Sequence, residues 1–154
     1  MQLYPRRVAS EPPATQNRRV LRKNAKIDLL RRIPLFERCS RAELGRIAAV
    51  ADELELPAGR TLTREGDTGR EFLVLVEGLA VVQRKGRRVN VLSKGDFLGE
   101  IALLTNRQRT ATVMTTTPVR VLVVTGRDFR RLLTDVPSLQ AKILAAVVER
   151  LPGD

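Results

Sequence analysis

Glycine-containing turns interrupt the chain at short intervals between residues 54 and 125, and the segments between them are rich in valine, leucine and threonine. Many short strands at even spacing, separated by such turns, indicate an antiparallel sandwich or jelly roll. The dipeptide Lys85-Gly86 lies between two valine pairs and is a good hairpin turn. The sequence predicts strands at residues 54–56, 61–64, 71–76, 80–84, 87–92, 111–115 and 119–125.

Apolar residues recur at helical spacing on both sides of this region. Upstream, a helix over residues 27–33 is expected, followed by a second helix that Ser40 opens, with Glu43 completing a capping box. Downstream, one helix is expected to be capped by Thr125 and another to begin at Pro137. The predicted fold is therefore α+β and mostly β, an antiparallel, jelly-roll-like β-roll flanked by N-terminal and C-terminal helices.

Positive charge is unevenly distributed. The 154 residues include 28 Lys and Arg against 17 Asp and Glu, and the first 26 residues alone hold seven basic side chains and one acidic one. This N-terminal stretch is proline-containing and has no apolar periodicity. We expect residues 1–25 to be a basic, disordered arm and residues 26–154 to form a single domain. The arm leaves open weak contact with nucleic acid or with an anionic surface.

Several functional classes are excluded by what the chain lacks. It has no histidine, and its single cysteine, Cys39, cannot form an internal disulfide. Histidine-based acid–base catalysis, a Ser/His/Asp triad and any usual zinc site are therefore ruled out. No apolar run is long enough to span a bilayer, and the N-terminus lacks the apolar region of a secretory signal. We expect a cytoplasmic protein that is not an enzyme and has neither catalytic residues nor a metal site.

Residues 95–113 depart from the strand pattern. A helix-compatible stretch starts at Glu100, directly after Gly99, and Arg109 follows nine residues later. The first amides of a helix lack partners and favour an anion. A guanidinium can pair with two phosphate oxygens at once, and a nearby carboxylate suits a hydroxyl. Phosphate held beside a hydroxyl is the chemistry of a ribose phosphate, and the apolar interior of the roll would accommodate a base.

This segment resembles the phosphate-binding cassette of cyclic nucleotide-binding domains, the module of catabolite-activator-type regulators, protein kinase regulatory subunits and cyclic-nucleotide-gated channels. The matching residues are Gly99-Glu100-Ile101-Ala102-Leu103 and Arg109-Thr110-Ala111-Thr112-Val113. The resemblance implies that Arg109 pairs with the cyclic phosphate and that Glu100 accepts from the ribose 2′-hydroxyl. The implied ligand site consists of Val82, Gly99, Glu100, Ile101, Ala102, Arg109 and Thr110.

The family further implies individual roles at this site. The backbone amides of Ala102 and Thr110 would donate to the phosphate, Gly99 would let the ribose approach closely, and Val82 would contact the base. The expected ligand is cAMP, and cGMP is also compatible, because Thr110 suits guanine as well as adenine. No cofactor is expected.

A regulatory function follows from the resemblance: the module would bind a cyclic nucleotide and signal to a separate, unidentified effector protein. The chain stops at Asp154 without a DNA-binding domain, so any lid over the base would come from residues 137–151 or from another chain. Two alternatives remain at this point. One is a scaffold with the same fold that no longer binds a ligand, and the other is a polyanion binder that acts through the basic arm.

Overall fold

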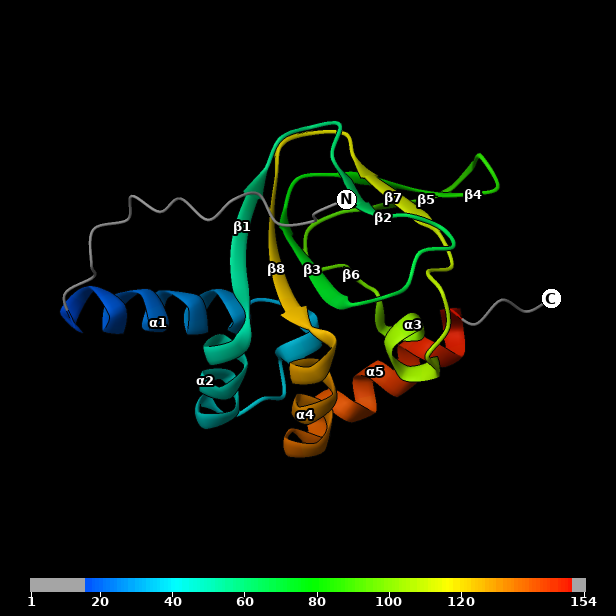
Figure 1. Cartoon of the computed structure of the whole chain (residues 1–154). Coiled ribbons are helices and arrows are strands. Elements are labelled where there is room, and N and C mark those ends of the chain that lie inside the picture. Colours follow the sequence, from blue (N-terminus) through cyan, green and yellow to red (C-terminus); the bar gives the residue numbers. More distant parts are fainter. Residues whose placement is uncertain (1–15, 151–154) are drawn as a thin grey trace.

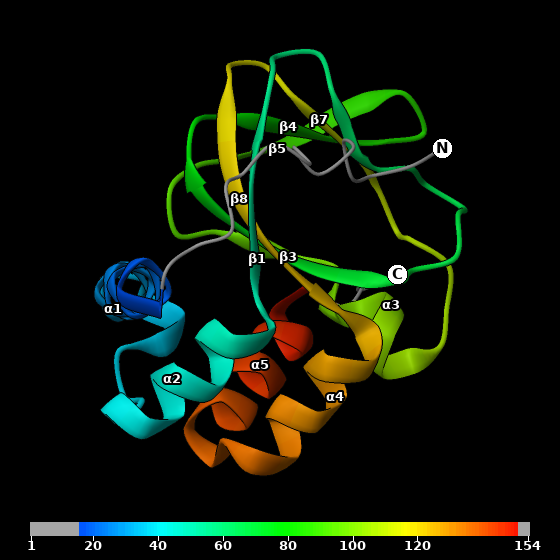
Figure 2. The same cartoon turned by 60° about the vertical axis from the view of Figure 1, so that its left-hand side comes forward.

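The computed structural model describes residues 16–150 of the chain. A group of helices lies against one side of a β-roll (Figures 1 and 2). The elements are α1 (Gln16–Arg31), the short 3-10 helix η1 (Pro34–Phe36), α2 (Arg41–Val50), β1 (Asp52–Leu56), β2 (Thr61–Thr63), β3 (Glu71–Glu77), β4 (Ala80–Arg84), β5 (Arg87–Leu92), β6 (Phe97–Leu98), α3 (Glu100–Thr105), β7 (Thr112–Thr115), β8 (Val119–Thr125), α4 (Gly126–Asp135) and α5 (Pro137–Arg150).

Two four-stranded antiparallel sheets form the roll. The first has the strand order β1-β8-β3-β6 and the second has the order β2-β7-β4-β5. Strands β4 and β5 are joined by the predicted hairpin turn, in which Lys85 and Gly86 both have positive φ (51° and 77°). Glycine adopts this conformation at little cost, which is why the Lys-Gly pair can close a two-residue hairpin.

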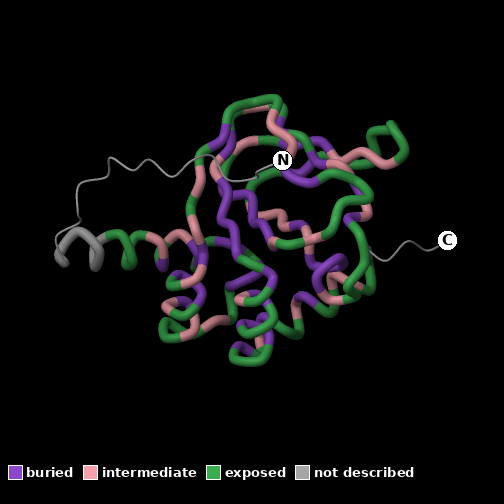
Figure 3. Tube along the Cα trace, in the orientation of Figure 1, coloured by how far each residue is buried: buried purple, intermediate pink, exposed green. Residues whose placement is uncertain are grey.

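Strands β3 and β8 are buried on both faces, which explains their nearly continuous apolar sequences. Alternate residues contribute to two separate clusters. Leu73 and Val121 lie in the interior of the roll, whereas Phe72 and Leu122 pack against the helices. Figure 3 shows these central strands as mostly buried, with exposed residues concentrated in the loops and on the outer helix faces. The first sheet therefore packs against the interior of the roll on one face and against the helices on the other.

Most of the elements expected from the sequence are confirmed, as is the fold class. Ser40 caps α2, and its hydroxyl accepts from the Glu43 amide (3.1 Å) while the Glu43 carboxylate accepts from the Ser40 amide (2.8 Å). Thr125 caps α4 in the same manner through the Asp128 amide. The two-residue strand β6 and the 3-10 helix η1 were not predicted, because segments this short have no measurable periodicity.

Residues 16–25, which were assigned to the N-terminal arm from the sequence, belong to α1. This stretch contains no proline, and its three arginines, together with single glutamine, leucine, lysine and alanine residues, favour helix. The helix is held to α2 by Lys26, whose Nζ donates to the carbonyls of Ala48 and Ala51. The remainder of the predicted arm, residues 1–15, lies outside the described residues. Within residues 16–150, no helix combines the length and the apolar character that a membrane span requires.

Candidate functional site

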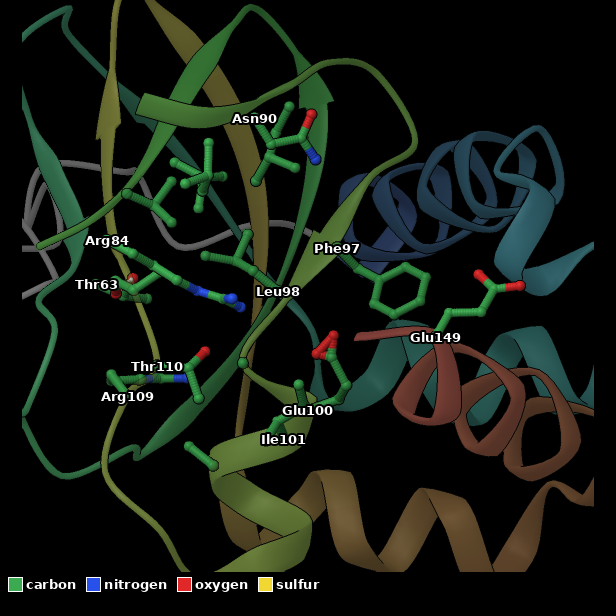
Figure 4. A pocket seen from close by; sticks show the side chains of 17 residues that line it. Thr63, Arg84, Asn90, Phe97, Leu98, Glu100, Ile101, Arg109, Thr110 and Glu149 are labelled. Atoms are coloured by element: carbon green, nitrogen blue, oxygen red, sulfur yellow. Dashed lines mark hydrogen bonds between the residues drawn. The ribbon is translucent and has the colours of Figure 1, made fainter. Parts of the chain in front are cut away.

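A cavity of about 390 Å³ lies between strands β4 and β5, the β6–α3 junction and the segment that leads into β7. Figure 4 shows the side chains that line it. All seven residues predicted from the sequence border this one cavity: Val82, Gly99, Glu100, Ile101, Ala102, Arg109 and Thr110. The fold thus brings together residues that come from β4, α3 and the loop before β7.

Arg109 is the cationic group on one side of the cavity and is only 7% exposed. Its Nη2 donates to the Glu71 carbonyl oxygen (2.7 Å), while Nη1 is buried and has no hydrogen-bond partner among residues 16–150. Its backbone is fixed as well, because its amide donates to the Asp67 carbonyl (2.7 Å) and its carbonyl accepts from the Gly66 amide (2.9 Å). A buried cationic donor without a partner is costly, and an anion in the cavity would remove that cost.

Burial lowers the pKa of the Arg109 guanidinium, and the carboxylates of Glu71 and Glu100 oppose that shift. Arginine nevertheless stays protonated in proteins, so the side chain presents a fixed positive charge to the cavity. Burial also raises the pKa of Glu71, with Arg109 and Arg70 acting in the opposite direction. The electrostatic environment around Arg109 therefore combines strong desolvation with two nearby acidic groups.

Gly99 packs directly against this guanidinium. Its φ is +101°, and a Cβ at this position would lie 2.5 Å from Arg109 Nη1 and 2.5 Å from the Glu71 carbonyl oxygen. Any side chain here would push the guanidinium or the β3 backbone out of place. Glycine thereby allows α3 to begin immediately beside the buried cation.

Glu100 is the first residue of α3 and is only 2% exposed. Its carboxyl group borders the same cavity as Arg109 (Figure 4). An ionised carboxylate is a pure hydrogen-bond acceptor, whereas a guanidinium is a pure donor. Arg109 can thus donate to an anion in this cavity, and Glu100 can accept from a hydroxyl.

The opposite wall of the cavity is largely apolar and comes from β4, β5 and β7. It contains Val82 together with residues that the sequence did not single out, namely Val89, Leu92, Ala111 and Val113. Arg84 and Asn90 on the same wall were also missed, as was Glu149 of α5, which reaches the cavity from the helical layer. Arg84 could have been predicted as a lining residue, because side chains two positions apart on a strand point to the same face and Val82 was already assigned to the site. Glu149 was not predicted as a site residue, although it lies within residues 137–151, the segment of this chain from which a lid was expected to come.

Helix α3 is also tied to the helical layer, so the cavity wall and the helices share contacts. Arg130 of α4 donates to the Leu103 carbonyl (3.1 Å), and Leu103 itself is buried among the helices. A Cβ on Gly126 would lie 2.8 Å from the Leu103 side chain, which shows how closely α3 approaches the start of α4. Helices α3 and α4 are therefore in direct contact.

The model of the family described as the cyclic nucleotide-binding domain matches residues 53–135. The cAMP-dependent protein kinase regulatory subunit of Blumeria graminis is 36% identical over 124 residues, which are 79% of this chain and 32% of that protein. The chain spans between about a fifth and a third of the length of the curated relatives that it matches first.

Two solved structures share the fold at lower sequence identity. The regulatory domain of Toxoplasma gondii PKA, crystallised with cAMP, has a TM-score of 0.72 at 24% identity and covers 82% of this chain and 51% of that one. The regulatory subunit of a cAMP-independent protein kinase A from Trypanosoma brucei has a TM-score of 0.76 at 22% identity, with coverages of 83% and 46%. The family model matches more than half of the chain, over residues 53–135, and most of the matching cassette residues Gly99–Ala102 and Arg109–Val113 line one cavity. The chain therefore belongs to the cyclic nucleotide-binding domain family.

Proposed function

We propose that this chain is a non-enzymatic regulatory module that binds a 3′,5′-cyclic nucleotide and passes the signal to a separate effector protein. The observation that carries the proposal is the buried Arg109, which lines the cavity and whose Nη1 has no hydrogen-bond partner in the described part of the chain. A cyclic phosphate would supply the missing acceptor and would pair with the positive charge. The family membership and the relatives that are cAMP-dependent kinase regulatory subunits support the same ligand class.

Each residue of the site has a role in this proposal. Arg109 pairs with the exocyclic phosphate oxygens, the amides of Ala102 and Thr110 donate to the same phosphate, and Glu100 accepts from the ribose 2′-hydroxyl. Val82 and its apolar neighbours contact the base. Because α3 contacts α4 through Arg130 and Leu103, a ligand that favours one position of α3 shifts the packing of the helices in the same step.

Calorimetric titration of the full chain with cAMP and with cGMP tests the proposal. We expect saturable one-to-one binding of at least one of the two nucleotides, together with an increase in the thermal unfolding temperature, because a ligand that binds only the folded state stabilises it. A folded chain that neither binds nor is stabilised at millimolar concentrations of both nucleotides would contradict the proposal. Such a result would favour a ligand-free scaffold with the same fold.

The role of Glu100 can be tested from the ligand side. We expect 2′-deoxy-cAMP to bind about tenfold or more weakly than cAMP, because a hydrogen bond to a charged group contributes roughly 1.5–3 kcal/mol. In Glu100→Gln this difference should shrink, since a neutral acceptor forms a weaker bond. Glu55→Gln is the matched control, because Glu55 is exposed on β1 and lies outside the cavity lining. Equal affinity of the wild type for the two nucleotides would refute the role of Glu100.

A further inference from the structure

A second guanidinium projects into the cavity from the wall opposite α3. Arg84 is the last residue of β4, two positions after Val82, and both side chains line the cavity. Side chains two residues apart on a strand point to the same face, so Arg84 extends the surface that Val82 begins. Figure 4 shows its side chain reaching toward the middle of the cavity, above Arg109 and Thr110.

The Nε of Arg84 is buried and has no hydrogen-bond partner among residues 16–150. The side chain is therefore a donor that the protein itself leaves unsatisfied, like Nη1 of Arg109. A cyclic phosphate carries a single negative charge, which Arg109 and the α3 side of the cavity already match in the proposed function. The donor on Arg84 is thus left for another part of the ligand.

Asn90 on β5 adds a second donor to the same wall. It pairs in register with Val82, and its Oδ1 already accepts from the Val91 amide (2.8 Å). The NH2 group of this side chain is a donor, while Oδ1 keeps one further lone pair. Thr110 also lines the cavity, but its hydroxyl can both donate and accept and so does not discriminate between bases. The Thr63 hydroxyl already donates to the Ala111 carbonyl (3.1 Å).

Donors on this wall distinguish the two purines. Along its N7 edge, guanine presents two acceptors, N7 and O6, whereas adenine presents the acceptor N7 and a donor amino group. A guanidinium matches the two acceptors of guanine but opposes the amino group of adenine with another donor. Building on the proposed function, we propose that Arg84 is a specificity-determining residue that makes this site prefer cGMP to cAMP.

The experiment measures the affinities of the full chain for cGMP, cAMP and cIMP by calorimetry. Cyclic IMP keeps O6 and N7 and lacks only the 2-amino group of guanine, so it isolates the edge that Arg84 would contact. We expect the wild type to bind both cGMP and cIMP about tenfold or more tightly than cAMP, the discrimination that one good arginine–guanine pair provides. In Arg84→Met, which keeps a long side chain but no donor, cGMP and cIMP should weaken to about the affinity of cAMP.

Arg87→Met is the matched control. Arg87 pairs with Arg84 across the hairpin but is exposed and does not line the cavity, so its loss removes the same charge without removing the donor. The preference for cGMP and cIMP should be unchanged in this variant. Arg84→Lys keeps the charge but not the forked donors, and its preference should fall between those of the wild type and Arg84→Met.

Three results would overturn the role of Arg84 while leaving the proposed function intact. These are equal wild-type affinities for cGMP and cAMP, an unchanged ratio in Arg84→Met, and equal weakening of both nucleotides in that variant, which would place Arg84 on the phosphate. Absence of binding to any of the three ligands would instead contradict the proposed function. If Arg84→Met does not fold, the wild-type comparison of cIMP with cAMP and the Arg84→Lys variant still decide the question.

Discussion

Replacing Arg109 with leucine is expected to weaken cyclic nucleotide binding by about a hundredfold or more. The guanidinium would donate charge-assisted hydrogen bonds to the phosphate, each of which contributes roughly 1.5–3 kcal/mol, and two such bonds correspond to at least about two orders of magnitude in affinity. The effect should apply equally to cAMP and cGMP, because both carry the same cyclic phosphate. Calorimetric titration of the variant with either nucleotide measures it.

The controls for Arg109 must separate binding from folding, because this side chain also has a structural contact. Its Nη2 donates to the Glu71 carbonyl, so Arg109→Leu leaves that oxygen without this donor and should lower the unfolding temperature as well. Arg109→Lys retains the charge but cannot make two parallel bonds, and we expect an intermediate affinity. Arg107→Leu removes an exposed cation from the same loop and should bind normally. Undiminished affinity in a folded Arg109→Leu variant would refute the phosphate assignment.

Much of the roll was predictable because its strands obey simple local rules. Turn glycines mark the strand ends, and the predicted bounds of β4, β5 and β8 coincide with those observed. The capping residues Ser40 and Thr125 likewise fixed two helix starts. The first helix was expected at residues 27–33 but begins at Gln16, because polar α1 has little apolar periodicity upstream of Ile27, where helical propensity favours it instead.

The candidate site was only partly predictable. Some of its polar groups are close together in the sequence, whereas others are brought to the site only by the fold. The cassette residues Glu100 and Arg109 are close in sequence and could be identified together. The carbonyl of Glu71, which orients Arg109, lies 38 positions away and belongs to the backbone, so no residue type reveals it. Arg84 was predicted only as the end of a strand, and its unpartnered, buried Nε beside the cavity is apparent only in the folded roll.

The contacts behind the cavity suggest where the largest effect on stability lies. Phe72 of β3 stacks on Phe129 of α4, with ring centroids 4.4 Å apart, and also contacts Phe97 of β6 at 5.6 Å. These rings join the first sheet to the helical layer, directly behind the junction that leads into α3. Phe129 is completely buried and packs in the same cluster as Leu103 of α3. The Phe72–Phe129 pair thus joins the roll to α4 within the apolar cluster that also contains Leu103.

Phe129→Ala should therefore lower the free energy of unfolding by about 3–5 kcal/mol, the usual cost of truncating a fully buried phenylalanine. Because small domains have about 5–15 kcal/mol in total, the variant should be folded only marginally. Urea denaturation measures the change as a lower midpoint with a similar slope. Leu144→Ala on α5 is the matched control, since Leu144 is 53% exposed and its truncation should change stability by no more than about 0.5 kcal/mol.

Ligand addition makes the same variant informative about coupling. A nucleotide at a hundred times its dissociation constant stabilises the folded state by about 2.7 kcal/mol. Its addition should therefore reverse a substantial part of the decrease in the urea midpoint of Phe129→Ala. If Phe129 only supports the fold, affinity measured below the unfolding transition should stay close to that of the wild type. If it also fixes the position of α3 through Leu103, affinity should fall together with stability. A loss of stability no larger than that of Leu144→Ala would contradict the bridging role of this ring.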